Sequence, residues 1–311
     1  MYYNTHILKS ADGESICYYK WEANPNVPFR GLLQIAHGLG EHAGRYDSIA
    51  HLLQEEGYSV YANDHRAHGK TAEIKRLFGF YDGKEYFDDC VADMYALSTI
   101  MKTEKPQSKF ILFGHSMGSL LSRKYVTKYG KELDALILSG TASFIKGLGN
   151  IGLVTATTVT AFRGRSRGNE FLKSFFFGEF NKKFKPNRTK FDWISSNEKE
   201  VDLYAKDPYR IEDFSLGVFL DLIKNSKKLN KPEAFKATPE NLPVLIFSGD
   251  KDPVGEMGKG VKRVVEQYKN RGMQDLTFNL YEGGRHEMLN EVNGKAVKQE
   301  VISWLNARIK D

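Results

Sequence analysis

Two serines in the sequence lie between glycines in the pattern Gly-x-Ser-x-Gly: Ser116 in GHSMG and Ser166 in GRSRG. A serine in this pattern can be a nucleophile on a sharp turn from a strand into a helix, because the glycines leave room where a Cβ would collide with neighbouring backbone. With 28 glycines in 311 residues, one match can arise by chance. The motif alone therefore does not distinguish the two serines.

The sequence on either side of Ser116 is typical of a strand followed by a helix. The apolar run KFILFG (109–114) predicts the strand, and residues 117–130 continue as an amphipathic helix that ends at Gly130. The N-terminus of that helix would favour a negative charge that develops at the serine. We therefore expect Ser116 to be a catalytic nucleophile.

Ser166 has different surroundings. Three arginines flank it in AFRGRSRG, which suits a solvated loop better than a packed turn. The preceding TATTVTAF (155–162) could be a strand, so the context does not exclude a second turn of the same kind. We expect Ser166 to lie in a loop without a catalytic role.

A serine hydroxyl is a weak nucleophile at neutral pH and needs a general base. Only His286, in YEGGRHEMLN, follows Ser116 along the chain, so the order Ser, acid, His would make His286 the base. The acid that orients the imidazole would come from SGDKDPVG, where Asp250 and Asp252 follow an apolar run. Either could be an ordinary turn aspartate, and the local sequence leaves the choice open.

Short apolar runs alternate with helical patterns on both sides of these residues. A hairpin with a turn at Asp12-Gly13 comes first. Further strands are expected at 31–38, 58–65, 109–114, 133–140, 242–250 and 276–284, and helices at about 45–56, 85–102, 117–130, 257–270 and 295–309. This alternation predicts an α/β fold with a mostly parallel central sheet and helices on both faces.

Residues 141–236 differ from the rest in composition. They contain 18 Lys and Arg against 11 Asp and Glu, a local excess of seven positive charges, and 12 of the 20 phenylalanines. We interpret them as an insertion between two parts of one core, 1–140 and 237–311. The phenylalanines can form the insertion's own core, or line an apolar tunnel rimmed with positive charge that suits an amphiphile.

Several functional classes are not expected. The net charge of +6 raises nucleic acid as a partner, but no nucleic-acid-binding motif accompanies it. The two cysteines, Cys17 and Cys90, predict neither a disulfide framework nor a metal site, and no segment approaches 18 unbroken apolar residues. His37, His42 and the histidines of DHRAH (64–68) lack a supporting set of metal ligands, and no glycine-rich phosphate loop follows a strand. We expect no cofactor or metal, and a cytoplasmic location.

Five blocks of the sequence resemble the α/β-hydrolases, and within them the monoacylglycerol lipase and bacterial lysophospholipase-like group. These blocks are AHGLGEHAGRY (36–46), NDHRAHGKT (63–71), GHSMGS (114–119), GDKDPVG (249–255) and GGRHEMLNE (283–291), in family order. The resemblance spans the chain except for 141–236, which lies where this family places its cap.

The resemblance implies a role for individual residues. Ser116 would be the nucleophile and His286 the base. The family pattern G-x-x-D falls on Gly249 to Asp252, which favours Asp252 over Asp250 as the acid. The backbone N–H groups of Leu39 and Met117 would form the oxyanion hole, where a donor is worth about 3–4 kcal/mol in the transition state.

The expected function is hydrolysis of a carboxylic ester of a monoacyl lipid, lysophospholipid or monoacylglycerol, through an acyl-enzyme. The substrate would be a small acyl ester, with transient contact of the protein with an anionic membrane surface. An alternative keeps the triad and changes the scissile bond to a small ester, a thioester or an N-terminal peptide bond. A non-catalytic binding protein is the least favoured reading, because every triad candidate is present.

Overall fold

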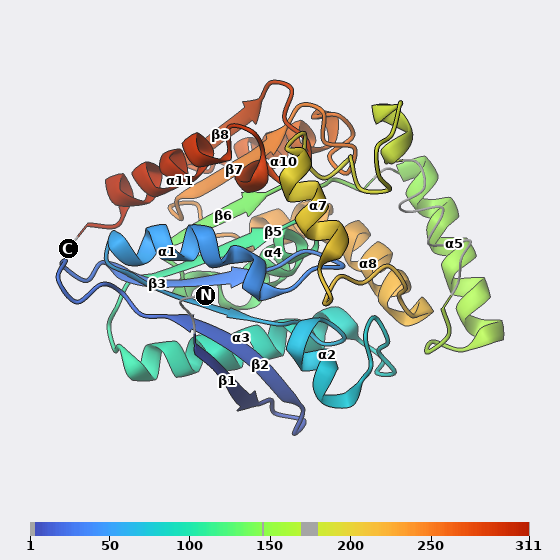
Figure 1. The fold of residues 1–311 in the computed structure, drawn as a ribbon, viewed down its shortest axis with the longest axis horizontal. Helices are drawn as coiled ribbons and strands as arrows, with labels where there is room; N and C mark the ends of the chain where they lie inside the picture. The colour runs from blue at the N-terminus through green and yellow to red at the C-terminus, as the bar shows by residue number, and fades with distance from the viewer. Residues whose placement is uncertain (1–3, 145, 169–179, 311) are drawn as a thin grey trace.

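The computed structural model describes residues 4–144, 146–168 and 180–310, and an eight-stranded sheet lies at its centre (Figure 1). The strand order is β1-β2-β4-β3-β5-β6-β7-β8. β3 to β8 pair in parallel, and β2 is antiparallel to both of its neighbours. The α/β class with a mostly parallel sheet is therefore confirmed.

The strands and helices of the sheet region lie within a few residues of their predicted positions. The strands are β1 (Asn4–Lys9), β2 (Ser15–Trp21), β3 (Gly31–Ala36), β4 (Tyr58–Asn63), β5 (Phe110–His115), β6 (Ala135–Ser139), β7 (Val244–Gly249) and β8 (Leu276–Tyr281). The helices are α1 (Asp47–Glu55), α2 (Gly69–Lys75), α3 (Tyr86–Glu104), α4 (Met117–Tyr129), α10 (Lys259–Asn270) and α11 (Gly294–Arg308). The short helix α2 was not expected.

Both faces of the sheet are apolar because successive side chains of a strand point to opposite faces. In β5, Phe110 and Leu112 join one core cluster, whereas Ile111 and Phe113 join the other. Helices α3, α4 and α10 contribute to the first cluster, and α1 and α11 to the second (Figure 1). The central strands are thus covered on both faces, whereas β1 is mostly exposed. Catalytic groups can therefore reach a substrate from the ends of these strands and from the loops.

The segment between β6 and β7 consists mainly of helices in the part that is described. They are α5 (Lys146–Arg163), the short 3-10 helix η3 (Asn181–Phe184), α7 (Glu198–Lys206), α8 (Leu216–Leu229) and α9 (Pro232–Lys236). α8 packs against α3, α4 and α5, so the end of this segment is joined to the sheet's own helices. None of the described helices combines the length and the apolar character that a bilayer span requires.

The interpretation of TATTVTAF as a strand is wrong, since these residues belong to α5. Among the positions of this helix whose burial is described, the buried residues Gly152, Ala156 and Thr160 recur every fourth residue, which is the spacing of one helix face. Ser166 follows the end of this helix, in a loop whose Arg165 and Arg167 carbonyls accept hydrogen bonds from the start of α8. Ser166 therefore has no strand before it.

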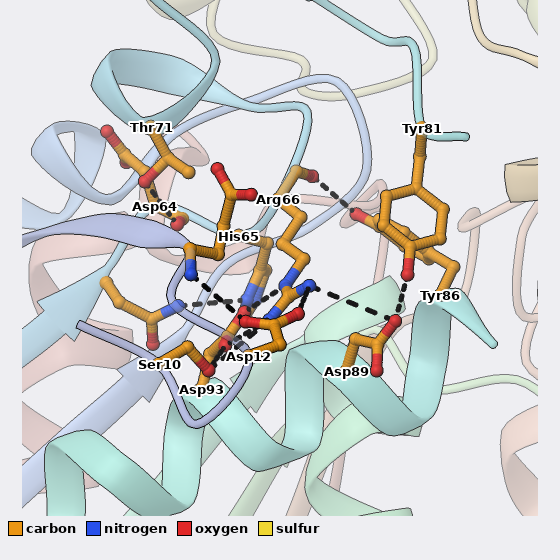
Figure 2. A network of polar contacts seen from close by, with 12 residues as sticks. Ser10, Asp12, Asp64, His65, Arg66, Thr71, Tyr81, Tyr86, Asp89 and Asp93 are labelled. Carbon is orange, nitrogen blue, oxygen red and sulfur yellow. Dashed lines mark hydrogen bonds and ion pairs between the residues drawn. The ribbon is translucent and has the colours of Figure 1, made fainter. Parts of the chain in front are cut away.

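The loop after β4 is held by a buried arginine (Figure 2). The Arg66 guanidinium donates to both carboxylate oxygens of Asp93 at 2.7 and 2.9 Å, and to both of Asp12 at 2.6 and 3.1 Å. The Asp93 side chain is fully buried and also accepts from Ser10. Burial raises the pKa of Asp93, and the hydrogen bonds and charge of Arg66 oppose that shift. Arg66 thus joins the first hairpin, the β4 loop and α3.

Replacement of Arg66 by methionine should lower the free energy of unfolding by about 3–5 kcal/mol, because it leaves the Asp93 carboxylate buried without its partner. Arg308→Met is the matched control: Arg308 also bonds both oxygens of an aspartate, Asp275, but that pair is partly exposed. Its loss should cost no more than about 1 kcal/mol. Urea unfolding of both variants measures the difference, and equal losses would contradict the structural role of Arg66.

Candidate active site

Ser116 occupies a strained turn between β5 and α4. Its backbone has φ +53° and ψ −119°, a conformation that L-residues rarely adopt. A Cβ at Gly118 would overlap the Ala36 carbonyl of β3, and one at Gly114 would overlap the Gly118 carbonyl. The two glycines of GHSMG are therefore required by close backbone packing, and they allow the strand to turn sharply at the serine.

Ser116 lines a cavity of about 260 Å³. His286 lines the same cavity, and so do Leu39 and Met117. The other walls are mostly apolar and come from α4, from the loop after β7 and from the segment 141–236, including Leu120, Phe144, Phe180, Trp193, Leu222 and Val254. The structure thus brings a serine, a histidine and two backbone turns together around one apolar space.

His286 is paired with one of the two candidate aspartates. Its Nδ1 lies 3.0 Å from Oδ2 of Asp252, whose side chain is fully buried. Asp252 also accepts from the Ser248 hydroxyl at 3.1 Å and from the Val254 N–H at 2.9 Å. Asp250 instead accepts the Gly283 N–H at 2.8 Å and lies partly exposed. Of the two aspartates, Asp252 is the one in contact with the imidazole.

The surroundings of His286 favour its protonated form. Burial lowers the pKa of His286, but the charge and hydrogen bond of Asp252, together with the charges of Glu287 and Glu41, outweigh burial and raise it above its ordinary value. The His115 ring lies on one side, with its centre 4.8 Å from that of His286, and the Trp193 ring on another, at 5.3 Å. The imidazole is therefore enclosed as well as paired.

The turn after β3 is held by side chains on each side of Leu39. The Gly38 N–H donates to Oε1 of Glu41 at 2.6 Å, and the Gly40 N–H donates to Nε2 of His68 at 3.2 Å. These two bonds fix the shape of the turn that carries Leu39. Met117 is the first residue of α4, and the N–H groups of a helix's first turn have no acceptor within the helix.

The rings of His37 and His68 bond to the backbone, whereas the ring of His42 bonds to the Asp207 carboxylate. His37 accepts the His65 N–H at 2.9 Å through Nε2, and His68 accepts from Gly40. Asp64 accepts the N–H groups of Ala43 and Lys70. Within the described ranges, no group of three or more His, Cys, Asp or Glu side chains is arranged to hold a metal ion. His37, His68 and Asp64 thus hold the loops after β3 and β4.

The phenylalanines of 141–236 divide between two environments. Phe144 and Phe180 line the cavity, whereas Phe214, Phe219 and Phe235 are buried in the protein core. Phe162 is 87% exposed on α5. Phe171, Phe175, Phe176 and Phe177 lie outside the described residues. Phe144 and Phe180 thus fit the interpretation as a cavity wall, whereas Phe214, Phe219 and Phe235 belong to a core cluster shared with the sheet and its helices rather than to a core of the insertion alone.

Three charged residues beside the cavity were missed in the sequence. Arg45 bonds to both Glu41 and Glu287, which line the cavity. The spacing of Glu41 and Arg45, four residues apart, was a usable signal for that pair. The contact of Arg45 with Glu287 joins residues 242 apart, which no local pattern indicates.

Comparison with known proteins agrees with the fold. The chain is 29% identical over 304 residues to a monoacylglycerol lipase of Mycolicibacterium smegmatis, covering 96% of each chain. It is 26% identical over 306 residues to the monoglyceride lipase of Mus musculus, covering 97% of this chain and 90% of that one. The crystal structure of a thermostable carboxyl esterase from Bacillus coagulans in complex with glycerol matches over the whole length of both chains, with a TM-score of 0.92 and 27% identity.

These likenesses confirm the resemblance to the monoacylglycerol lipase-like α/β-hydrolases that the five sequence blocks indicated. The family model itself matches residues 28–293, which include both sides of the cavity and the segment between β6 and β7. With that match, the chain belongs to the Hydrolase_4 family of hydrolases, described as serine aminopeptidase, S33.

Proposed function

We propose that the protein is a serine carboxylic-ester hydrolase that acts on monoacyl lipids. One observation carries the proposal: Ser116, on its strained turn, shares an apolar cavity with a histidine that is hydrogen-bonded to a buried aspartate. Relatives named as monoacylglycerol and monoglyceride lipases support the same substrate class. In this proposal the segment 141–236 is a cap that forms part of the acyl-chain wall.

Each step of the reaction has a candidate group in the cavity. The Ser116 hydroxyl attacks the ester carbonyl carbon while Nε2 of His286 accepts its proton, and Asp252 stabilises the imidazolium. The carbonyl oxygen becomes negative, and the N–H groups of Leu39 and Met117 donate to it. His286 then protonates the departing alcohol, which leaves an acyl-enzyme on Ser116. Water, activated by His286, releases the fatty acid and restores the serine.

The charge distribution in the cavity disfavours the aminopeptidase alternative that the family description raises. An aminopeptidase must hold the ammonium of its substrate, which requires carboxylates that are free to pair with it. Glu41, Glu287 and Glu256 line the cavity, but arginines already occupy them: Arg45 bonds the first two and Arg263 bonds Glu256. The apolar walls suit an alkyl chain instead.

Contact with an anionic lipid surface is part of the same proposal. α5 exposes Ile151, Val154 and Phe162 on the side away from its buried small residues. Cations flank the cavity: Lys227 lies 5.8 Å from the Phe144 ring, and Arg263 bonds to Ser143, which lines the cavity. Apolar side chains with neighbouring cations are the combination that binds anionic membrane surfaces.

Substitution of the nucleophile and the acid should abolish or sharply reduce hydrolysis. Ser116→Ala should remove both ester hydrolysis and labelling by a fluorophosphonate probe. Asp252→Asn should lower kcat by roughly 10⁴-fold, as loss of the orienting carboxylate does in other triads. The matched controls, Ser166→Ala and Asp250→Asn, should retain most of the activity.

Kinetics with a soluble ester and mass spectrometry of the labelled protein check these outcomes. A probe adduct on Ser166 would overturn the assignment of the nucleophile. A larger loss of kcat in folded Asp250→Asn than in folded Asp252→Asn would transfer the role of the acid to Asp250.

The apolar walls should make kcat/KM rise from acetyl esters to medium-chain esters, roughly C6 to C12, since each buried CH₂ is worth about 0.8 kcal/mol. Only the part of that energy realised in the transition state raises kcat/KM. Phe180→Ala should flatten the rise, whereas Phe162→Ala, at an exposed position, should leave it unchanged. A chain-length series below the micelle concentrations tests this, and a flat profile for the unmodified protein would show that the cavity does not hold the acyl chain.

Added salt should slow turnover of an anionic lysophospholipid more than turnover of a neutral monoacylglycerol with the same acyl chain. The cations beside the cavity attract the anionic head, and salt screens that attraction over about 8–10 Å. Initial rates at two ionic strengths measure the difference. An equal response of the two substrates would indicate that these cations are a solvated face, and it would remove the preference for lysophospholipid and for an anionic surface.

A further inference from the structure

Arg45 lies where three segments of the chain meet. Its guanidinium donates to Oε2 of Glu41 at 2.7 Å and to both oxygens of Glu287 at 2.8 and 2.7 Å. Its third neighbour is the ring of Tyr204 on α7, whose centre is 4.7 Å away. All three charged side chains are nearly buried, with 11%, 5% and 8% exposed for Arg45, Glu41 and Glu287.

Each carboxylate extends this contact to a part of the proposed catalytic site. Glu41 accepts the Gly38 N–H at 2.6 Å, next to the proposed oxyanion donor Leu39. Glu287 directly follows His286, and its own N–H donates to the Ile194 carbonyl at 2.7 Å, beside Trp193. One guanidinium therefore connects the turn that carries Leu39 to the loop that carries His286.

Opposite charges strengthen the contacts of Arg45 with Glu41 and Glu287. Burial would raise the pKa of Glu287, but the charge and hydrogen bonds of Arg45, with help from His115 and Asn290, hold that pKa well below its usual range. Glu287 is thus ionised beside Arg45. Because the planar guanidinium reaches three carboxylate oxygens at fixed angles, a lysine in its place could supply the charge without the same geometry.

We propose that Arg45 is a positioning residue for the hydrolysis reaction, holding the oxyanion turn and the His286 loop at one relative position through Glu41 and Glu287. This inference rests on the proposed function, because it assigns Arg45 to the same transition state. Arg45 itself does not line the cavity, so its effect on the reaction passes through the two carboxylates.

Charges around His286 affect its pKa, so the pH dependence of the reaction provides a readout besides the rate. The titratable groups that face it are Asp252 from the loop after β7, Glu41 from the turn after β3, His115 from β5, and the adjacent Glu287. His286 must be unprotonated to accept the serine proton, and the carboxylates favour its protonated form. Removal of the charge of Glu287 should therefore move the acid limb of the kcat/KM profile to lower pH.

The test compares Arg45→Gln, Arg45→Lys and Glu287→Gln with the control Arg308→Gln. Arg308 is also paired with a carboxylate, that of Asp275, but it does not line the cavity. With a soluble short-chain ester, Arg45→Gln should lose about 10²-fold in kcat, the cost of a small misplacement of reacting groups, with KM changed less than about threefold. Arg45→Lys should recover part of that loss, and Glu287→Gln should shift the acid limb downward. Arg308→Gln should match the unmodified protein.

Equal kcat in the folded Arg45→Gln and Arg308→Gln variants would overturn the positioning role, and so would a loss confined to KM. If Arg45→Gln does not fold, the other two variants test the proposal. Full activity of Arg45→Lys together with an unchanged acid limb in Glu287→Gln would also overturn the positioning role. Failure of the proposed function would appear differently, as hydrolysis and probe labelling that survive Ser116→Ala.

Discussion

The close approach of α4 to β3 is the constraint on which the rest of the site depends. Gly118 lies so near the Ala36 carbonyl that no side chain fits there, and Gly114 lies equally near the first turn of the helix. The chain can therefore leave β5 and enter α4 only through one tight bend, with Ser116 at its tip. Ser116, Met117 and Leu39 of the turn after β3 line the same cavity, so this packing contact bears on both the serine and the two proposed backbone donors.

The residues that line the cavity are mainly of two kinds, apolar side chains and charged side chains that are paired. Most of the lining is apolar, and each of the lining carboxylates Glu41, Glu287 and Glu256 is bonded to an arginine. Asp252 is the carboxylate that contacts the imidazole. Glu41 and Glu287 share one arginine and Glu256 pairs with another, so all three already have a partner. In the proposed function, this pairing is what disfavours the binding of a substrate ammonium.

Sequence reasoning succeeded where a pattern reflects packing in a local segment. Buried strands produced apolar runs, and the glycines around Ser116 marked the bend correctly. The same reasoning misread TATTVTAF, whose two buried residues, Ala156 and Thr160, are four apart, a spacing that fits both a helix face and alternate positions of a strand. It could not choose between Asp250 and Asp252 from local sequence, since both follow one strand and only the folded loop determines which carboxylate meets His286. The Arg45–Glu287 pair required the tertiary structure for the same reason.

The order of the strands also affects how the sheet can form while the chain is being synthesised. In the finished sheet β6 lies between β5 and β7, but residues 140–243 separate the end of β6 from the start of β7. At translation rates of about 5–20 residues per second, the edge of β6 waits roughly 5–20 s for its partner. During that interval the nascent chain already contains Ser116 and the turn after β3, but neither Asp252 nor His286. An unpaired edge in the middle of the future sheet can pair with another chain, and the proposed base His286 joins Ser116 only when translation is nearly complete.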